Sequence, residues 1–263
     1  MWRETVLGVK PLRTYFRMAA IVAGAVFVLA ALIFVPPVDR TLGGIFARSA
    51  DGATVANYPE RLREQLTRGE WGYVDYSHLP ASLEQALISV EDKRFLLHGG
   101  IDPVALVRAL AEDAQNDHVD HGGATIPLQL ARMMLEIPRR QPSALAELAS
   151  QLRIMRAALI VEHAYSKQRI LELYLNGVYL GHGATGVAAA AEAYFHVPIQ
   201  RLNEAQCIYT AGLPNNPSRF GADPSGEAAM ARYRHVIATM VRNGYLTEHE
   251  AAALRGVQLF SQH

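Results

Sequence analysis

The chain has 263 residues, half of them hydrophobic, and it carries 25 basic and 25 acidic residues. This length suits one globular domain, with or without an appendage. The neutral net charge argues against a nucleic-acid-binding protein, which usually shows a basic excess. Cys207 is the only cysteine, so no disulfide can form within the chain.

An apolar segment near the N-terminus, Met18 to Val35, contains no charged residue. About 20 apolar residues span a bilayer, whereas the apolar part of a cleaved signal peptide has about 7–15. Basic residues precede the segment, namely Lys10, Arg13 and Arg17. By the positive-inside rule, residues 1–17 then stay in the cytoplasm. We therefore predict one uncleaved transmembrane anchor over residues 18–37, with the rest of the chain outside the cytoplasmic (inner) membrane. A buried core helix is the alternative.

Residues 38–70 contain no repeat and no low-complexity tract, and we predict that they form a linker. Beyond them, helix signals dominate. Ser82, followed by Gln85, has the spacing of a capping box at a helix start.

Further helix boundaries follow along the chain. The expected starts are Asp102-Pro103, Ser166, Asp223-Pro224 and Thr247 with Glu250, and Asn176-Gly177 is an expected end. Long runs of alternating β-branched residues are absent from the sequence. Residues 71–258 are thus predicted to form one mainly α-helical domain.

A charged turn, "SVEDKRFLLHGGID", follows the first of these helices. Leu83, Leu87 and Val90 form an apolar arc on that helix, and Glu91 lies at the edge of the arc. Partial desolvation at such an edge makes a carboxylate a better base near neutral pH. A boundary glutamate whose carboxylate simply reaches water is the alternative.

The same turn resembles the first motif of the peptidoglycan glycosyltransferases, Glu-Asp-x-x-Phe-x-x-His-x-Gly-x-Asp. Every defining position agrees: Glu91, Asp92, Phe95, His98, Gly100 and Asp102. This family comprises the transglycosylase domains of bifunctional penicillin-binding proteins and the monofunctional transglycosylases. The resemblance implies a lysozyme-like helical fold.

A second stretch, "GGATIPLQLAR" from Gly122 to Arg132, is similar to the family's Gly-Gly-Ser-Thr-Ile-Thr-Gln-Gln-Leu-x-Lys. Thr125 and Gln129 are among the agreeing positions, and Arg132 replaces the lysine. Later segments, "SKQRILELYLN" and "AGLPNNP", also resemble the family. The resemblance runs from about Trp71 to Leu254, and it is of the monofunctional type.

The family's third motif, Arg-Lys-x-x-Glu, has no counterpart here. Counting back from "SKQRILELYLN" without gaps, it falls on Ser150 to Ile154, where the defining residues are absent. Glu147 and Arg153 lie nearby. They either compensate for the missing charges or belong to a solvated helix face.

The resemblance implies that the chain polymerises lipid II and releases polyprenyl pyrophosphate. Glu91 would be the base, and the substrate-binding residues would be Asp92, His98, Thr125, Gln129 and Arg132. A divalent metal at the pyrophosphate is left open, and no metal ligand is assigned. The expected partners are lipid II, the growing glycan strand, the membrane and other cell-wall synthesis proteins, but not nucleic acid.

Two other functions remain open: a non-catalytic domain that binds lipid II or cell-wall proteins, and a glycan-cleaving enzyme with one acidic glutamate. Two further patterns are weak. Gly181 to Gly186 fits G-x-G-x-x-G but follows a predicted helix rather than a strand, so we reject a dinucleotide site. His118, Asp120 and His121 have loose metal spacing, but a polar loop explains them as well.

Overall fold

The computed structural model describes residues 50–69, 72–105, 125–138 and 140–260. Two compact units can be distinguished, residues 45–101 with 124–263 and residues 1–44 with 102–123. All elements named below belong to the first unit, and only residues 102–105 of the second are described.

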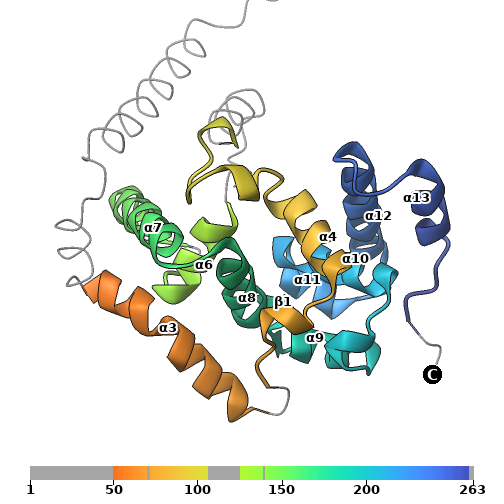
Figure 1. Cartoon of the computed structure of the whole chain (residues 1–263), viewed down its shortest axis with the longest axis horizontal. Coiled ribbons are helices and arrows are strands. Elements are labelled where there is room, and N and C mark those ends of the chain that lie inside the picture. Colours follow the sequence, from red (N-terminus) through yellow and green to blue (C-terminus); the bar gives the residue numbers. More distant parts are fainter. Residues whose placement is uncertain (1–49, 70–71, 106–124, 139, 261–263) are drawn as a thin grey trace, which may run out of the picture. The chain divides into compact units, whose positions relative to one another are not determined.

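The described part is mainly α-helical, which confirms the predicted class (Figure 1). Its elements, in chain order, are α3 (Ala50–Thr67), η1 (Tyr76–His78), α4 (Ala81–Glu91), η2 (Phe95–Leu97), α6 (Ile126–Met134), α7 (Ala144–Ala164), α8 (Lys167–Gly177), β1 (Tyr179–Gly181), β2 (Ala184–Thr185), α9 (Val187–Phe195), η3 (Ile199–Arg201), α10 (Glu204–Gly212), η4 (Leu213–Asn215), α11 (Pro217–Ala222), α12 (Glu227–Arg242) and α13 (Glu248–Arg255).

The predicted anchor over residues 18–37 lies outside the described residues, and so do His118, Asp120 and His121. Among the helices that are described, none combines the length and the apolar composition that a membrane crossing needs.

Helix α3 occupies most of the segment expected to be a linker. Val55, Tyr58 and Leu62 follow one another at helical spacing, and all three belong to the hydrophobic core. The Tyr165 hydroxyl also donates to the Val55 carbonyl, at 3.0 Å. The folded domain therefore includes α3, and the boundary expected at residue 70 needs correction. The helical spacing of Val55, Tyr58 and Leu62 is the sequence signal for this buried helix.

Several predicted caps are confirmed. Ser166 accepts a hydrogen bond from the amide of Arg169, and α8 ends at Gly177. Thr247 and Glu250 form a capping box at the start of α13. Asp102 accepts from the Val104 amide at 2.9 Å, directly before helical residues.

Two predicted helix starts are wrong. Helix α4 begins at Ala81 after Pro80, so Ser82 lies inside the first turn. Proline has a fixed φ and no amide hydrogen, so it can precede a helix without leaving a donor unpaired. Asp223 lies before a turn closed by the Gly226 amide, and α12 starts only at Glu227. Asp followed by Pro is favoured in such turns as well as at helix starts.

Strands β1 and β2 form a short antiparallel hairpin, with Tyr179 opposite Thr185 and Gly181 opposite Ala184. Gly181 has a φ of 85°, and a Cβ there would lie 2.1 Å from the Pro217 carbonyl oxygen. The glycines of the G-x-G-x-x-G segment thus allow a tight hairpin to pack against α11.

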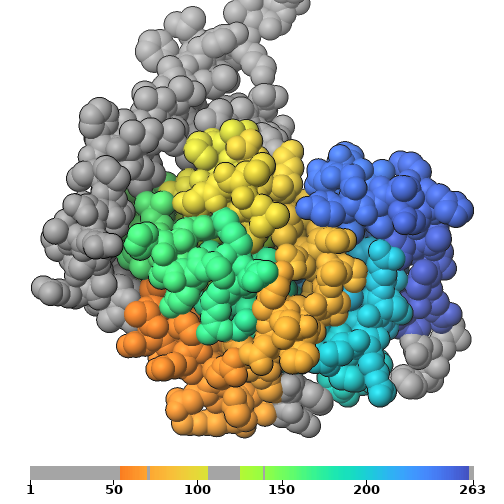
Figure 2. Space-filling view, viewed as in Figure 1, coloured from red at the N-terminus to blue at the C-terminus, as the bar shows by residue number. Residues whose placement is uncertain are grey.

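Helix α8 supplies much of the core. Ile170, Leu171, Leu173 and Tyr174 are almost completely buried. Helix α6 packs against α7 and α8, whereas α4 packs against α10 and α12 (Figure 1). In Figure 2 the gold surface of α4 lies between the green surface of the α6–α8 region and the blue surface of the C-terminal helices. The C-terminal end of α4 therefore meets side chains from both sides.

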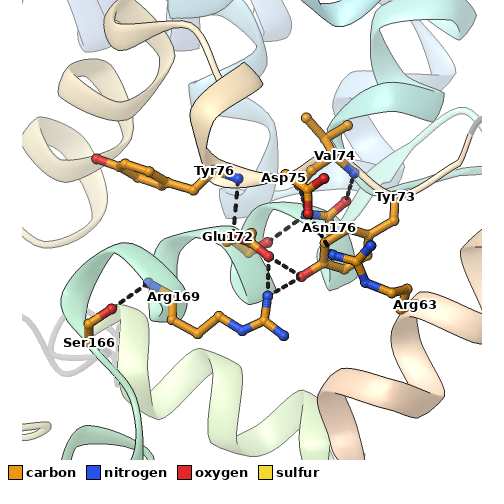
Figure 3. A network of polar contacts seen from close by, with 9 residues as sticks. All are labelled: Arg63, Tyr73, Val74, Asp75, Tyr76, Ser166, Arg169, Glu172 and Asn176. Atoms are coloured by element: carbon orange, nitrogen blue, oxygen red, sulfur yellow. Dashed lines mark hydrogen bonds and ion pairs between the residues drawn. The ribbon is translucent and has the colours of Figure 1, made fainter.

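A polar network ties the segment before α4 to helix α8 (Figure 3). The Glu172 carboxylate accepts from the Tyr73 hydroxyl at 2.6 Å, from the Tyr76 amide at 3.1 Å, and from Arg169. Burial and the bond to Glu172 raise the pKa of the Tyr73 hydroxyl, so it stays a donor. These contacts fix the chain as it enters α4.

Asn176 completes this network one turn further along α8. Its side-chain oxygen accepts from the Val74 amide at 2.9 Å, and its nitrogen donates to the Val74 carbonyl at 2.8 Å. The side-chain amide of Asn176 thus binds both backbone polar groups of Val74, as the backbone of a neighbouring β-strand would. Both polar residues of "ILELYLN" that face this segment hold the fold together.

Candidate active site

Glu91 is the last residue of α4, and its side chain is 11% exposed. One carboxylate oxygen, Oε2, accepts from Gln129 Nε2 of α6 at 2.9 Å. The other, Oε1, accepts from Arg232 Nη2 of α12 at 3.0 Å. Gln129 and Arg232 are far apart in sequence. They therefore hold the two carboxylate oxygens of Glu91 from two different helices, α6 and α12.

Each of these two partners is held in turn. The Gln129 Oε1 atom accepts from the hydroxyl of Tyr174 on α8, at 2.9 Å. The Nε atom of Arg232 donates to the Gly212 carbonyl at the end of α10, at 3.1 Å. The carboxylate thus sits at the centre of a chain of hydrogen bonds that includes four helices besides α4.

The side chain of Arg232 is only 15% exposed. Burial lowers the pKa of its guanidinium, and the neighbouring Glu91 opposes this change. An arginine nevertheless keeps its charge in proteins. A buried positive charge at this distance favours the ionised form of a carboxylate. The Glu91 carboxylate is therefore held by an amide donor on one oxygen and by a cation on the other.

Sequence reasoning found Glu91 and Gln129 but assigned no role to Arg232 or Tyr174. For Arg232 a signal existed. Ala229 and Val236, one turn before and one turn after it on α12, are both buried. An arginine in line with two core positions is unusual unless it has a partner.

Asp92 and His98 contact each other next to this centre. The Nε2 atom of His98 lies 2.9 Å and 3.0 Å from the two carboxylate oxygens of Asp92. Asp92 Oδ2 also accepts from the Ile126 amide at 3.0 Å, at the first residue of α6. A carboxylate is favourable at that end of a helix. Both side chains are only 3% exposed, and they join the turn after α4 to the start of α6.

Thr125 makes a second connection between the same two segments. It is the N-cap of α6, and its hydroxyl donates to the Gly100 carbonyl at 2.7 Å. Gly100 has a φ of 90°, and a Cβ there would lie 2.9 Å from the Ala158 carbonyl oxygen. Only glycine fits without a shift of the backbone.

Lys167 holds the turn after α4 from the other side. Its ammonium donates to the His98 carbonyl and to Glu162, each at 2.6 Å. It also lies 4.5 Å from the centre of the Phe95 ring, within cation–π range. The lysine of "SKQRILELYLN" thus anchors the segment that carries Asp92 and His98.

Arg132 lies one turn beyond Gln129 on α6 and donates to the Pro138 carbonyl at 3.0 Å. It is partly exposed. The six predicted site residues are therefore not all in one place. Glu91 and Gln129 are in direct contact, whereas Asp92, His98 and Thr125 form a buried cluster beside them.

The position expected for the third-motif glutamate holds Ile154 on α7. This side chain belongs to the hydrophobic core and is 2% exposed. Glu147 accepts from Gln151 at 2.6 Å, and Arg153 is exposed. A carboxylate at residue 154 would be buried among apolar side chains in this chain.

Within the residues that the structure describes, no three side chains of His, Cys, Asp or Glu are grouped so that they could hold a metal ion. A divalent metal at the pyrophosphate stays a prediction.

Comparison with known proteins gives a consistent result. The family model described as transglycosylase matches residues 59–241. Penicillin-binding protein 1A of Escherichia coli is 36% identical over 202 residues, which cover 77% of this chain and 22% of that protein. The Aquifex aeolicus protein of the same name is 34% identical over 178 residues, 68% of this chain and 24% of its own length.

A protein of Cupriavidus necator that is named as a transglycosylase is 34% identical over 190 residues, 71% of this chain and 79% of that protein. This chain therefore spans about a quarter of the penicillin-binding proteins that it matches and most of the smaller relative. The matched region contains Glu91, Gln129, Tyr174 and Arg232. The chain belongs to the transglycosylase family, that is, to the peptidoglycan glycosyltransferases.

Proposed function

We propose that this chain polymerises lipid II into β-1,4-linked glycan strands and releases polyprenyl pyrophosphate. The observation that carries the proposal is the Glu91 carboxylate, held between Gln129 and Arg232. Membership of the transglycosylase family supports a glycosyl-transfer reaction at this site.

In the proposed reaction, Glu91 takes the proton from the 4-hydroxyl of the acceptor sugar. The hydroxyl oxygen attacks the anomeric carbon of the donor and forms the new glycosidic bond. The bond between that carbon and the pyrophosphate oxygen breaks, and the pyrophosphate leaves with the electron pair. A well-placed general base contributes about 10²–10⁴-fold to the rate of such a step.

Gln129 and Arg232 would act by orientation. They bind different oxygens of Glu91, so the carboxylate plane is fixed before substrate arrives. Fixed geometry matters because a misplacement of about 1 Å can cost about 10²-fold in rate. The buried cluster of Asp92, His98 and Thr125 would shape the wall of the substrate site.

The leaving pyrophosphate needs positive charge, and Arg132 is the proposed source. It lies on α6 three residues after Gln129, a spacing that puts both residues on neighbouring positions of the helix surface. Removing one preorganised electrostatic group typically costs about 2.7–4 kcal/mol of transition-state stabilisation. A divalent ion could supply the same charge when bound.

We also propose that residues 18–37 anchor the protein in the cytoplasmic membrane, with residues 1–17 in the cytoplasm and the catalytic domain outside. This arrangement is supported by the uncharged Met18 to Val35 segment and by the basic residues before it. It would hold the domain next to its lipid-linked substrate and to other cell-wall synthesis proteins.

One observation favours a second candidate, a domain that binds lipid II without polymerising it. Ile154 occupies the position of the third-motif glutamate and is part of the core. Ile154 therefore cannot supply the negative charge that the family's third motif has at this position.

The test is polymerisation of labelled lipid II by the purified full chain in detergent, beside Glu91→Gln. Polymer from the wild type but not from the variant supports the proposed reaction. No polymer from either protein, with lipid II still bound, would instead support the binding domain. Cleavage of finished peptidoglycan without polymerisation would indicate a glycan-cleaving enzyme.

A further inference from the structure

Helix α12 contacts the C-terminal end of α4 at a second point besides Arg232. The two helices pack against each other (Figure 1). Asn243, the C-cap residue of α12, donates from its side-chain nitrogen Nδ2 to the Ser89 carbonyl at 3.0 Å. The same nitrogen lies 3.0 Å from the Ser89 hydroxyl oxygen. Ser89 is buried and precedes Glu91 by two residues, so α12 also binds the backbone of α4 next to the proposed base.

The polarity of the contact between Asn243 and the Ser89 carbonyl is fixed by chemistry. A backbone carbonyl oxygen accepts hydrogen bonds and cannot donate them, so the nitrogen end of the amide must face it. Ser89 lies in the last turn of α4, where the carbonyls have no amide partner within the helix. The Ile88 carbonyl, one residue earlier, accepts from the Asp92 amide at 3.1 Å. Asn243 therefore supplies the donor for the next carbonyl in the row, from a different helix.

The backbone around Asn243 is held by the way α12 ends. The Tyr245 amide donates to the Met240 carbonyl at 2.9 Å, and the Gly244 amide donates to the Val241 carbonyl at 3.0 Å. Gly244 has a φ of 77°, in the left-handed region. These features form a Schellman motif, a common helix ending. The side chain of Asn243 thus reaches α4 from a well-defined position.

We propose that Asn243 is a positioning residue: it caps the carbonyl end of α4 and thereby fixes the backbone from which the Glu91 side chain projects. The inference rests on the proposed role of Glu91 as the base. It does not depend on which groups bind the Glu91 carboxylate, because the contact is made to the backbone two residues earlier.

Two separate contacts with α12 restrain the end of α4 better than one. Arg232 and Asn243 are eleven residues apart, which corresponds to about 16 Å along a helix. A single contact would allow the end of α4 to pivot about it, whereas two distant contacts oppose that motion. Helix ends fray readily. Since a misplacement of about 1 Å can cost about 10²-fold in rate, a restrained last turn matters for Glu91.

The direct test is Asn243→Asp, with lipid II polymerisation as the readout. This change keeps the shape of the side chain but replaces the donor by a carboxylate oxygen, which a carbonyl repels. The rate at saturating lipid II should fall by about 10-fold per folded molecule, with KM little changed, because the base is displaced and not removed. If Asn243→Asp does not fold, Asn243→Ala replaces it with the same expectation. An unchanged rate would overturn the proposal.

Two control variants separate this role from general stability. Ser89→Ala removes the hydroxyl but keeps the carbonyl that Asn243 binds, so it should keep its rate. Thr247→Ala removes the cap of α13, four residues after Asn243, and it should lower stability without lowering the rate per folded molecule. A loss of rate in either control as large as in Asn243→Asp would contradict the proposal.

A second readout needs no turnover. The Asp92 amide donates to the Ile88 carbonyl at the same end of α4, so its hydrogen exchange reports on the last turn. In the full chain, this amide should exchange about fivefold faster in Asn243→Asp, and at the wild-type rate in Thr247→Ala. An unchanged exchange rate in Asn243→Asp would overturn the proposal. If the wild type does not polymerise lipid II, only the proposed function fails, and hydrogen exchange still decides whether Asn243 holds the end of α4.

Discussion

Glu91 and Glu172 look alike at first sight. Their side chains are 11% and 9% exposed, and each pairs with an arginine. Glu172, however, accepts from a backbone amide as well as from side chains, and its partners lie in its own helix α8 and in the segment before α4. Glu91 is bound by side chains of two other helices.

This difference shows that burial and an ion pair do not by themselves identify a base. The Glu172 carboxylate binds the residues that connect two segments of the fold, so its hydrogen bonds are part of the fold (Figure 3). The donors to Glu91, in contrast, are the side chains of Gln129 and Arg232, and they hold a carboxylate at the C-terminal end of α4. We therefore assign chemistry to Glu91 and stability to Glu172, and the variants below test that division.

The largest effect is expected for Glu91→Asp. This change keeps the charge but shortens the side chain, so the carboxylate moves away from both Gln129 and Arg232. The polymerisation rate should fall by about 10²-fold or more, because geometry is lost. The urea midpoint of unfolding should hardly change. A fully active Glu91→Asp would show that the orientation of this carboxylate is unimportant.

The next effect concerns the cation beside the base. Arg232→Lys keeps the charge but loses the donor to the Gly212 carbonyl, because lysine has no planar fork of donors. We expect a fall of about 10-fold in the rate at saturating lipid II, with substrate affinity little changed. A selective loss of affinity would instead mean that Arg232 acts on the substrate and not on Glu91.

For the second region we expect a change in stability only. Tyr73→Phe removes the hydroxyl that donates to Glu172 and accepts from Arg169, at 2.6 Å and 3.1 Å. The free energy of unfolding should fall by about 1 kcal/mol. The rate per folded molecule should remain that of the wild type, and a reduced rate would break the division between the two sites.

The smallest effect is expected for His235 on α12, whose pKa depends on burial and on two nearby arginines. Burial, Arg232 and Arg242 lower the pKa of His235 below its ordinary value of 6.5. The unfolded chain then binds the proton more readily, so His235 contributes stability above about pH 6.5 that is lost as the pH falls. Because His235 is exposed, solvent screens these charges and the effect should be small. Urea midpoints at pH 7.5 and pH 5 should converge slightly in His235→Gln, and an increase in the pH dependence would contradict this sign.

The sequence predicted the helical class, and two motifs that resemble the family placed Glu91 and Gln129 among the candidate site residues, but no contact between these two residues was predicted. Helix starts with side-chain caps, such as Ser166 and Thr247, were equally readable. Asp223-Pro224 was misread because the same two residues favour a turn and a helix start.

The rest depended on contacts between distant segments. The distance from Glu91 to Arg232 is set by the packing of α4 on α12, which no local pattern encodes. Helix α3 was missed because its few apolar residues stand among many polar ones. The sequence did not indicate the structural role of Glu172 either. This residue lies inside "SKQRILELYLN", a stretch that resembles a family segment, and its hydrogen bonds reach residues about 100 positions earlier in the chain.

The most direct test of this account is one matched pair, Glu91→Gln and Glu172→Gln, measured for lipid II polymerisation per folded molecule and for stability. Both substitutions remove one charge and keep the shape of the side chain. We predict that Glu91→Gln loses at least about 10²-fold in rate and keeps its stability. Glu172→Gln should keep its rate and lose about 1–2 kcal/mol of unfolding free energy. Activity that survives in Glu91→Gln, or disappears only in Glu172→Gln, would contradict the assignment of the base.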